Sequence, residues 1–277
     1  MAARPSQMPQ MRSKPTFLQP LALRGRELLI ETQWLSPERS HAPLTVFLHE
    51  GLGSLSQWRE FPQRLCDALG CRGLVFSRPG YGKSTPRTDA WPQDYLQRQS
   101  RELLPAYFDA LGLQHDERLF LFGHSDGASL ALLFAAAFPA RVRGLVALAP
   151  HLFVEPMTVA GLRKAKEAFE SGRSLRAALA RHHADVDSAF YGWNDAWLRP
   201  GFAEQWNIEA ELRGLACPVL ALQGEGDEYG SLAQIEAVGR IHPAVRVLAL
   251  EQCGHAPQRD QTDRVIAETL RLWQACQ

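Results

Sequence analysis

The sequence has few cysteines, and they follow no pairing pattern. There are five in 277 residues, an odd number, and no Cys-x-x-Cys motif is present. Disulfide-stabilised secreted folds carry more cysteines at closer spacings. We therefore expect free thiols and a cytoplasmic protein.

Long apolar runs are also missing. No stretch reaches 18 apolar residues, which argues against a membrane span. Residues 1–16 contain Arg4, Arg12 and Lys14 together with three prolines, and they lack the apolar segment of a signal peptide. We expect these sixteen residues to be a mobile tail.

The chain has no excess of charge of either sign. Lysine plus arginine number 30, as do aspartate plus glutamate, so there is no electrostatic reason to expect nucleic acid or an anionic membrane as the main partner. Motifs for metals and nucleotides are absent too: residues 80–84 (GYGKS) lack the spacing of a phosphate-binding loop. We expect no metal and no cofactor, and a small-molecule substrate as the partner; the oligomeric state stays open.

What the chain does contain is a series of short apolar runs, typical of strands covered on both faces. Helical patterns at 57–69, 93–111, 129–138, 231–241 and 263–275 alternate with them, which predicts βαβ units and a mostly parallel, doubly wound α/β sheet. The expected strands are 45–49, 73–77, 119–123, 144–150, 218–222 and 246–250, with an earlier one at 27–34 near the sheet edge.

One long segment interrupts this alternation. Residues 152–213 contain no convincing strand but include two helical stretches and an aromatic-rich stretch at 190–206. Sixty residues are too many for an ordinary connection. We predict a helical cap inserted into a core formed by residues 17–151 and 214–277, and we expect its His182 and His183 to be solvated or to reach the boundary between cap and pocket.

The pentapeptide Gly123-His124-Ser125-Asp126-Gly127 fits the pattern G-x-S-x-G. It follows an apolar strand and precedes an apolar helix, so it lies where a sharp strand-to-helix turn exposes a serine hydroxyl. The helix start also directs free N–H groups toward a reacting oxygen. Ser125 is therefore the predicted nucleophile.

A serine nucleophile needs a base, and the base needs an acid that orients it. Asp227 follows an expected strand and a Gly-x-Gly turn, at the sheet edge where sites gather; Glu225 and Glu228 compete for the same role. His255 follows the last expected strand in a glycine-containing loop, and we predict that it is the base.

A second glycine-rich turn, residues 49–54 (HEGLGS), follows the expected strand at 45–49. Acyl transfer passes through an oxyanion that needs two N–H donors. We assign one donor to the N–H of Asp126 and the other to the N–H of Gly51 or Leu52.

Along the chain the motifs follow in the order HEGLGS, RPGYGKS, GHSDG, the helical insertion, GEGDEYG and CGH. With this order the chain resembles the α/β-hydrolase family from about Pro20 to Cys276. It is similar to the capped group that includes small carboxylesterases, prolyl aminopeptidases and meta-cleavage-product C–C hydrolases. The resemblance implies that Ser125, Asp227 and His255 form a catalytic triad. Glu50, Asp126 and the residues RPGYGKS depart from the group's usual motifs, which leaves the substrate class open.

These residues predict a serine hydrolase of a small apolar or aromatic ester or thioester, acting through an acyl-enzyme. A C–C hydrolase of aromatic ring-cleavage products and a non-catalytic binding protein on the same fold are the alternatives. Glu50 is expected to bind a substrate amine or, preferably, to pair with Arg78 or Lys83, and the Asp126 side chain to be hydrogen-bonded away from the nucleophile. The predicted pocket residues are Glu50, His124, Trp193 and Trp197.

Overall fold

The computed structural model describes residues 15–277, and most of the expected N-terminal tail lies outside them. An eight-stranded sheet forms the centre, in the order β1-β2-β4-β3-β5-β6-β7-β8. The pairs β1–β2 and β2–β4 are antiparallel, whereas all pairs from β4 to β8 are parallel. The predicted mostly parallel α/β sheet is therefore confirmed. The strands are β1 Phe17–Leu23, β2 Arg26–Leu35, β3 Leu44–Leu48, β4 Arg72–Phe76, β5 Leu119–His124, β6 Val142–Leu148, β7 Val219–Gly224 and β8 Val245–Leu250.

Helices cover both faces of the sheet, and the strand sequences explain why. Phe120 and Phe122 of β5 pack into one core with α1 and α11, while Leu119 and Leu121 pack into the opposite core with α4. Both sets are fully buried, so the strand is apolar throughout rather than alternating. The helices of the sheet layers are α1 Phe61–Leu69, α2 Tyr95–Arg98, α3 Leu104–Ala110, α4 Asp126–Ala137, α9 Ala233–Ile241, α10 Pro257–Asp260 and α11 Thr262–Ala275, with short helical turns η1 Leu55–Trp58 and η3 Pro139–Arg141.

The structure differs from the expected elements at three places. β1 was not predicted, because it is an edge strand whose side chains are largely exposed and lack an apolar run. The helix expected at 57–69 breaks at Arg59, whose φ is 54°, into η1 and α1. The helix expected at 93–111 passes through a π-helical turn, η2 Gln99–Leu103, just before Pro105, which has no N–H to donate.

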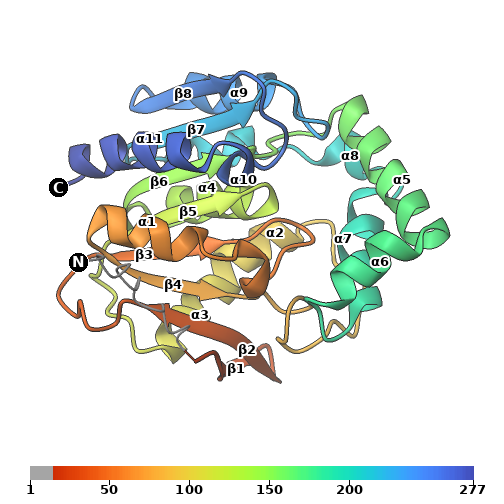
Figure 1. Ribbon diagram of the computed structural model, residues 1–277, viewed down its shortest axis with the longest axis horizontal. Coiled ribbons are helices and arrows are strands. Elements are labelled where there is room, and N and C mark those ends of the chain that lie inside the picture. The colour runs from red at the N-terminus through yellow and green to blue at the C-terminus, as the bar shows by residue number, and fades with distance from the viewer. Residues whose placement is uncertain (1–14) are drawn as a thin grey trace, which may run out of the picture.

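The chain between β6 and β7 forms a separate group of helices at one end of the sheet, seen at the right of Figure 1. An isolated bridge between Phe153 and Asn207 joins the two ends of this segment. Its helices are α5 Pro156–Ser171, α6 Arg173–Ala180, α7 Val186–Trp197, α8 Phe202–Gln205 and η4 Glu209–Gly214.

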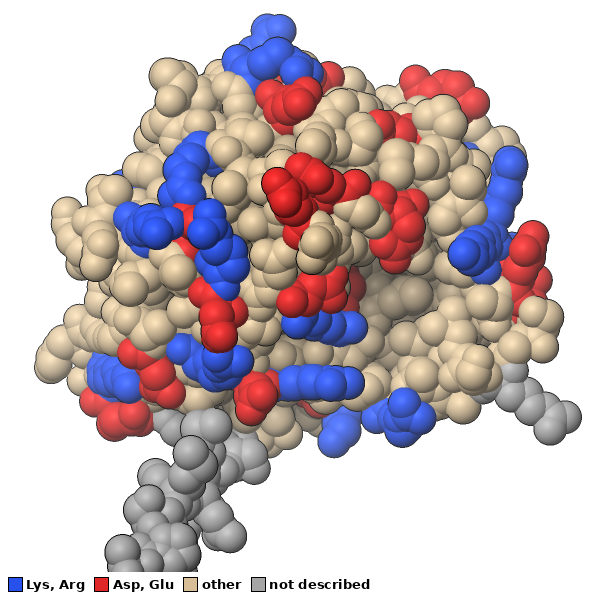
Figure 2. All heavy atoms as spheres, turned by 45° about the horizontal axis from the view of Figure 1, so that its top comes forward, with Lys and Arg blue, Asp and Glu red and all other residues tan. Residues whose placement is uncertain are grey.

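The surface drawn in Figure 2 carries both kinds of charge, with acidic side chains grouped near its middle and basic side chains beside and below them. This agrees with the equal numbers of acidic and basic residues in the chain. Within residues 15–277, no helix combines the length and the apolar character needed to cross a bilayer.

Candidate active site

The candidate residues come together because the parallel strands end at the same edge of the sheet. β5 ends at His124, immediately before Ser125, and its neighbour β3 ends at Leu48, before the HEGLGS turn. The loops after β7 and β8 carry Asp227 and His255. Crevices outside the carboxyl ends of such strands are where ligands bind in open α/β sheets.

Ser125 lies in a strained turn between β5 and α4. Its φ of 53° and ψ of −121° fall outside the regions that non-glycine residues favour, and the residue is 6% exposed. A Cβ at Gly123 would lie 2.3 Å from the carbonyl oxygen of Gly127, and a Cβ at Gly127 would lie 2.0 Å from that of Leu48. Both glycines are therefore required for α4 to start this close to β5 and β3.

Asp227 and His255 form a direct contact. Nδ1 of His255 lies 2.9 Å from each carboxylate oxygen of Asp227. The buried carboxylate also accepts hydrogen bonds from the Tyr229 N–H and from Nε2 of Gln223. Burial raises the pKa of Asp227, but its hydrogen bond with His255 and the charge of His255 outweigh that effect and lower it. An ionised Asp227 can only accept, so Nδ1 of His255 donates and Nε2 is left as the basic nitrogen.

The competing acids lie elsewhere. Glu225 and Glu228 flank Asp227 in the same loop, but both are exposed to solvent. Asp227 is 5% exposed and is the carboxylate that contacts His255. The three carboxylates of this loop therefore differ in burial, and only the buried Asp227 is placed to orient His255.

The loop that carries His255 is held by a second histidine. Nε2 of His124 donates to the carbonyl oxygen of His255 at 2.7 Å, and Nδ1 lies 3.4 Å from the Glu50 carboxylate. His124 was expected to line the substrate pocket, and this is wrong: its ring lies at the end of β5, against Trp58, and supports His255 from behind.

Glu50 is also paired differently from the expectation. Its carboxylate faces His124 and Arg259, the latter at 3.5 Å, and not Arg78. Burial raises the pKa of Glu50, but the hydrogen bond and charge of His124, together with the charge of Arg259, lower it well below its usual range. Glu50 therefore carries a compensated negative charge at the edge of the pocket.

Arg78 is fully buried and binds the backbone of the HEGLGS turn. Its guanidinium donates to the carbonyl oxygens of His49 at 3.2 Å and Glu50 at 3.0 Å, and to Oε1 of Gln99 at 2.9 Å. It also lies 3.8 Å from the carboxylate of Asp126. The sequence contains one indication of a special role for Arg78: it lies in RPGYGKS, a segment that departs from the usual motif of the group that the chain resembles.

Asp126, directly after the nucleophile candidate, is 1% exposed. Tyr95 donates to its Oδ2 at 2.6 Å, and Trp197 donates in turn to the Tyr95 hydroxyl at 2.8 Å. Burial raises the pKa of Asp126, although Arg78 and Tyr95 oppose the shift. The expected hydrogen bond of this side chain is thus made by Tyr95, from α2.

His183 ties the helical segment to the same turn. Its Nδ1 accepts from the Gly82 N–H at 2.9 Å, so its Nε2 donates to the Leu52 carbonyl oxygen at 3.1 Å. Burial is the main cause that lowers the pKa of His183. The expectation that it is solvated is wrong, because both ring nitrogens bind backbone of the core.

A cavity of about 100 Å³ lies beside Ser125 and His255. Trp193 closes one side so tightly that a Cβ at Gly51 would lie 2.2 Å from the indole. The cavity is lined by Ser125, Asp126, His255, Glu50, Gly51, Leu52, Trp193 and Trp197, together with His151, Thr158, Leu162 and Tyr229.

The sequence did not predict four residues of the pocket, His151, Thr158, Leu162 and Tyr229, and His151 is the imidazole among them. Its ring stacks on that of His255 with centroids 5.9 Å apart, and its buried Nδ1 has no hydrogen-bond partner among the described residues. Burial, with the nearby charge of His255, lowers the pKa of His151 to about 3. The sequence did carry a signal for this residue, because His151 follows the end of β6, where site residues gather in α/β sheets.

Within residues 15–277, no group of three or more His, Cys, Asp or Glu side chains is arranged to hold a metal ion. The polar side chains of the cavity are three hydroxyls, two imidazoles, two carboxylates and the indoles of two tryptophans. These groups can donate and accept hydrogen bonds and move protons at a bound substrate.

Comparisons with known proteins identify the family of the chain. A sequence profile described as the alpha/beta hydrolase family matches residues 45–268. The chain is 31% identical to 2-hydroxy-6-oxononadienedioate/2-hydroxy-6-oxononatrienedioate hydrolase of Cupriavidus pinatubonensis, over 78% of this chain and 82% of that protein. It is 26% identical to 2-hydroxymuconate semialdehyde hydrolase of Pseudomonas putida, over 67% and 70%.

Solved structures share the fold at lower identity. The enol-lactonase from Burkholderia xenovorans superposes with a TM-score of 0.71 at 16% identity, covering 91% of this chain and 98% of that one. A thermophilic esterase from Thermogutta terrifontis gives 0.68 at 20% identity, covering 95% and 98%.

Replacing Arg78 by methionine should destabilise the protein by about 3–5 kcal/mol, because it leaves the buried Asp126 carboxylate without its cation. Urea denaturation measures the change. Arg259→Met is the matched control: this arginine faces Glu50 but is half exposed, so we expect a loss of at most about 1 kcal/mol. Equal losses in the two variants would contradict the structural role given to Arg78.

Proposed function

The chain belongs to the alpha/beta hydrolase family, and on that premise we propose that it is a serine hydrolase of small apolar or aromatic carboxylic esters or thioesters. The observation that carries the proposal is the contact between His255 and the ionised Asp227, beside a cavity that both His255 and Ser125 line. The positive φ of Ser125 supports it, since strain of this kind gathers at functional sites.

In the proposed reaction the Ser125 hydroxyl attacks the substrate carbonyl while Nε2 of His255 takes its proton. Asp227 keeps the other nitrogen protonated and stabilises the imidazolium. His255 then gives the proton to the leaving alcohol or thiol. In the second half of the reaction His255 takes a proton from water, which attacks the acyl carbonyl, and returns it to the Ser125 oxygen as the acid leaves.

The oxyanion is proposed to be held by backbone N–H groups. Asp126 is the first residue of α4, so its N–H has no partner within the helix, and the helix start adds a partial positive charge. Gly51 or Leu52 would supply the second donor from across the cavity. Arg78 and His183 bind carbonyl oxygens of this turn, which holds its peptide groups in place.

The size of the cavity favours a short acyl group. Its volume of about 100 Å³ is below the range of about 300–1,000 Å³ that is usual for drug-sized ligands. Trp193, Trp197 and Leu162, all from the segment between β6 and β7, form much of the wall. We propose that this segment acts as a cap that excludes water and sets the acyl preference.

A second candidate activity is hydrolysis of a carbon–carbon bond in an aromatic ring-cleavage product. The relatives named as hydrolases of 2-hydroxymuconate semialdehyde and of 2-hydroxy-6-oxo dienedioates favour it. Assaying p-nitrophenyl esters, thioesters and vinylogous diketones side by side separates the two. Turnover of the diketones alone would replace the ester proposal, and turnover of none would favour a binding protein.

Ser125→Ala and His255→Ala should each lower kcat for p-nitrophenyl acetate by at least about 10³-fold. The double variant should lose little more, because the two residues act in one proton transfer. Melting curves check that the variants stay folded. If Ser125→Ala keeps most of the activity, the proposed mechanism is wrong.

Asp227→Asn should lower kcat by about 10²–10⁴-fold, because an amide at this position can present its N–H₂ to Nδ1 and favour the wrong tautomer of His255. Glu228→Gln is the matched control: it makes the same chemical change one residue away, on an exposed side chain. Comparable losses in both variants would remove Asp227 from its proposed role.

Trp193→Ala should shift the preference among p-nitrophenyl esters toward longer acyl chains, since it opens the wall beside Gly51. Trp206→Ala is the control, because Trp206 is buried against Trp197 and Phe202 but does not line the cavity. It should lower stability by about 3–5 kcal/mol and leave the acyl profile unchanged. An unchanged profile for Trp193→Ala would remove the cap from the specificity proposal.

A further inference from the structure

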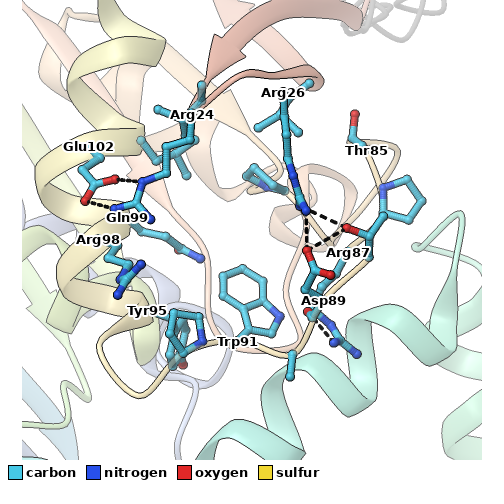
Figure 3. A pocket seen from close by; sticks show the side chains of 18 residues that line it. Arg24, Arg26, Thr85, Arg87, Asp89, Trp91, Tyr95, Arg98, Gln99 and Glu102 are labelled. Atoms are coloured by element: carbon cyan, nitrogen blue, oxygen red, sulfur yellow. Dashed lines mark hydrogen bonds and ion pairs between the residues drawn. The ribbon is translucent and has the colours of Figure 1, made fainter.

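A second and larger cavity lies apart from the catalytic one. It opens between the β1–β2 hairpin, the loop of residues 79–92 and the turns α2 and η2 (Figure 3). Its volume is about 480 Å³, within the usual range for small-molecule sites. It shares no lining residue with the cavity at Ser125. We refer to it as the hairpin cavity.

An aromatic ring and several apolar side chains form its walls. Trp91 stands at the centre of Figure 3. Tyr95 packs edge-on against it with a centroid distance of 5.0 Å, and the tilted ring of Tyr81 lies at 6.0 Å. Leu28 contributes from β2, and Pro86 from the loop. A half-buried indole fixed in this way offers a planar surface on which another aromatic ring can pack.

The charges of the hairpin cavity favour an anion. Arg24 pairs with Glu102, and Arg26 with Asp89, so these four charges cancel. Arg87 instead donates to the carbonyl oxygens of Asp89 and Ser188, which do not neutralise its charge.

A buried amide donor supplies a separate indication of a ligand. Gln99 is 6% exposed, its Oε1 accepts from Arg78, and its Nε2 has no hydrogen-bond partner among the described residues. Figure 3 shows this amide group directed toward Trp91. A buried donor without an acceptor is unfavourable, and a ligand oxygen would relieve it.

We propose that the hairpin cavity binds a small planar aromatic carboxylate. The ring packs on Trp91, a carboxylate oxygen accepts from Nε2 of Gln99, and the uncompensated charge of Arg87 attracts the anion. This site is separate from the ester substrate's, and binding to it does not depend on the proposed hydrolysis.

The test uses 2-naphthoate as the probe, with titration calorimetry on the full chain. We expect one site in the wild type and in Ser125→Ala alike, and weaker binding of the uncharged 2-naphthamide. Leu28→Glu should weaken binding of 2-naphthoate at least about tenfold, since it places a carboxylate inside the cavity. Leu29→Glu is the matched control: the next side chain points to the other face of β2, is 44% exposed and does not line the cavity.

A second variant covers the case in which Leu28→Glu fails to fold. Arg87→Gln removes the cation that attracts the anion and should weaken 2-naphthoate binding several-fold, and a melting curve checks that the variant is folded. The probe should also leave KM for p-nitrophenyl acetate unchanged, because the two cavities are separate. The proposal is overturned if the wild type does not bind 2-naphthoate or if Leu28→Glu and Leu29→Glu bind it equally. It is also overturned if 2-naphthoate competes with p-nitrophenyl acetate and Leu28→Glu does not alter that inhibition.

Discussion

The close approach of α4 to the sheet is the constraint on which the rest of the site depends. Gly123 and Gly127 leave no room for a Cβ, and Gly127 lies against the carbonyl group of Leu48 at the end of β3. This approach forces Ser125 into a positive φ and places the start of α4 beside the HEGLGS turn. The hydroxyl and the candidate oxyanion donors are therefore positioned by backbone packing and not by side-chain flexibility.

Around this turn lie three buried or partly buried charged side chains, Arg78, Asp126 and Glu50, and each has a charged or hydrogen-bonding partner. Arg78 binds the carbonyl groups of the HEGLGS turn and lies near Asp126, while Glu50 faces His124 and Arg259. Each negative charge near the proposed oxyanion thus has a positive or hydrogen-bonding partner. The pairing allows carboxylates to stand beside a site that must stabilise a further negative charge.

The helical segment between β6 and β7 contributes aromatic rings to one cavity and helps to define a second. Trp193 and Trp197 enclose the small space at Ser125, and Ser188 from the same segment receives a hydrogen bond from Arg87 at the hairpin cavity. Tyr95 lines the hairpin cavity and hydrogen-bonds to Asp126. The two cavities are separate, yet the hydrogen bond from Tyr95 to Asp126 connects a wall of one to a wall of the other.

The sequence by itself determined the sheet apart from its edge strand β1, the glycine-flanked turn at Ser125 and the placement of Asp227 and His255 in loops after strands. These features are local: apolar runs, glycines and chain order encode them within a few residues. Tertiary structure alone decided that Asp227 contacts His255 while Glu225 and Glu228 stay in solvent. It also paired Glu50 with Arg259, 209 residues away, brought His151 against His255 and turned His124 out of the pocket. Such contacts join residues far apart in the chain, so their partners depend on how the layers pack and not on any local pattern.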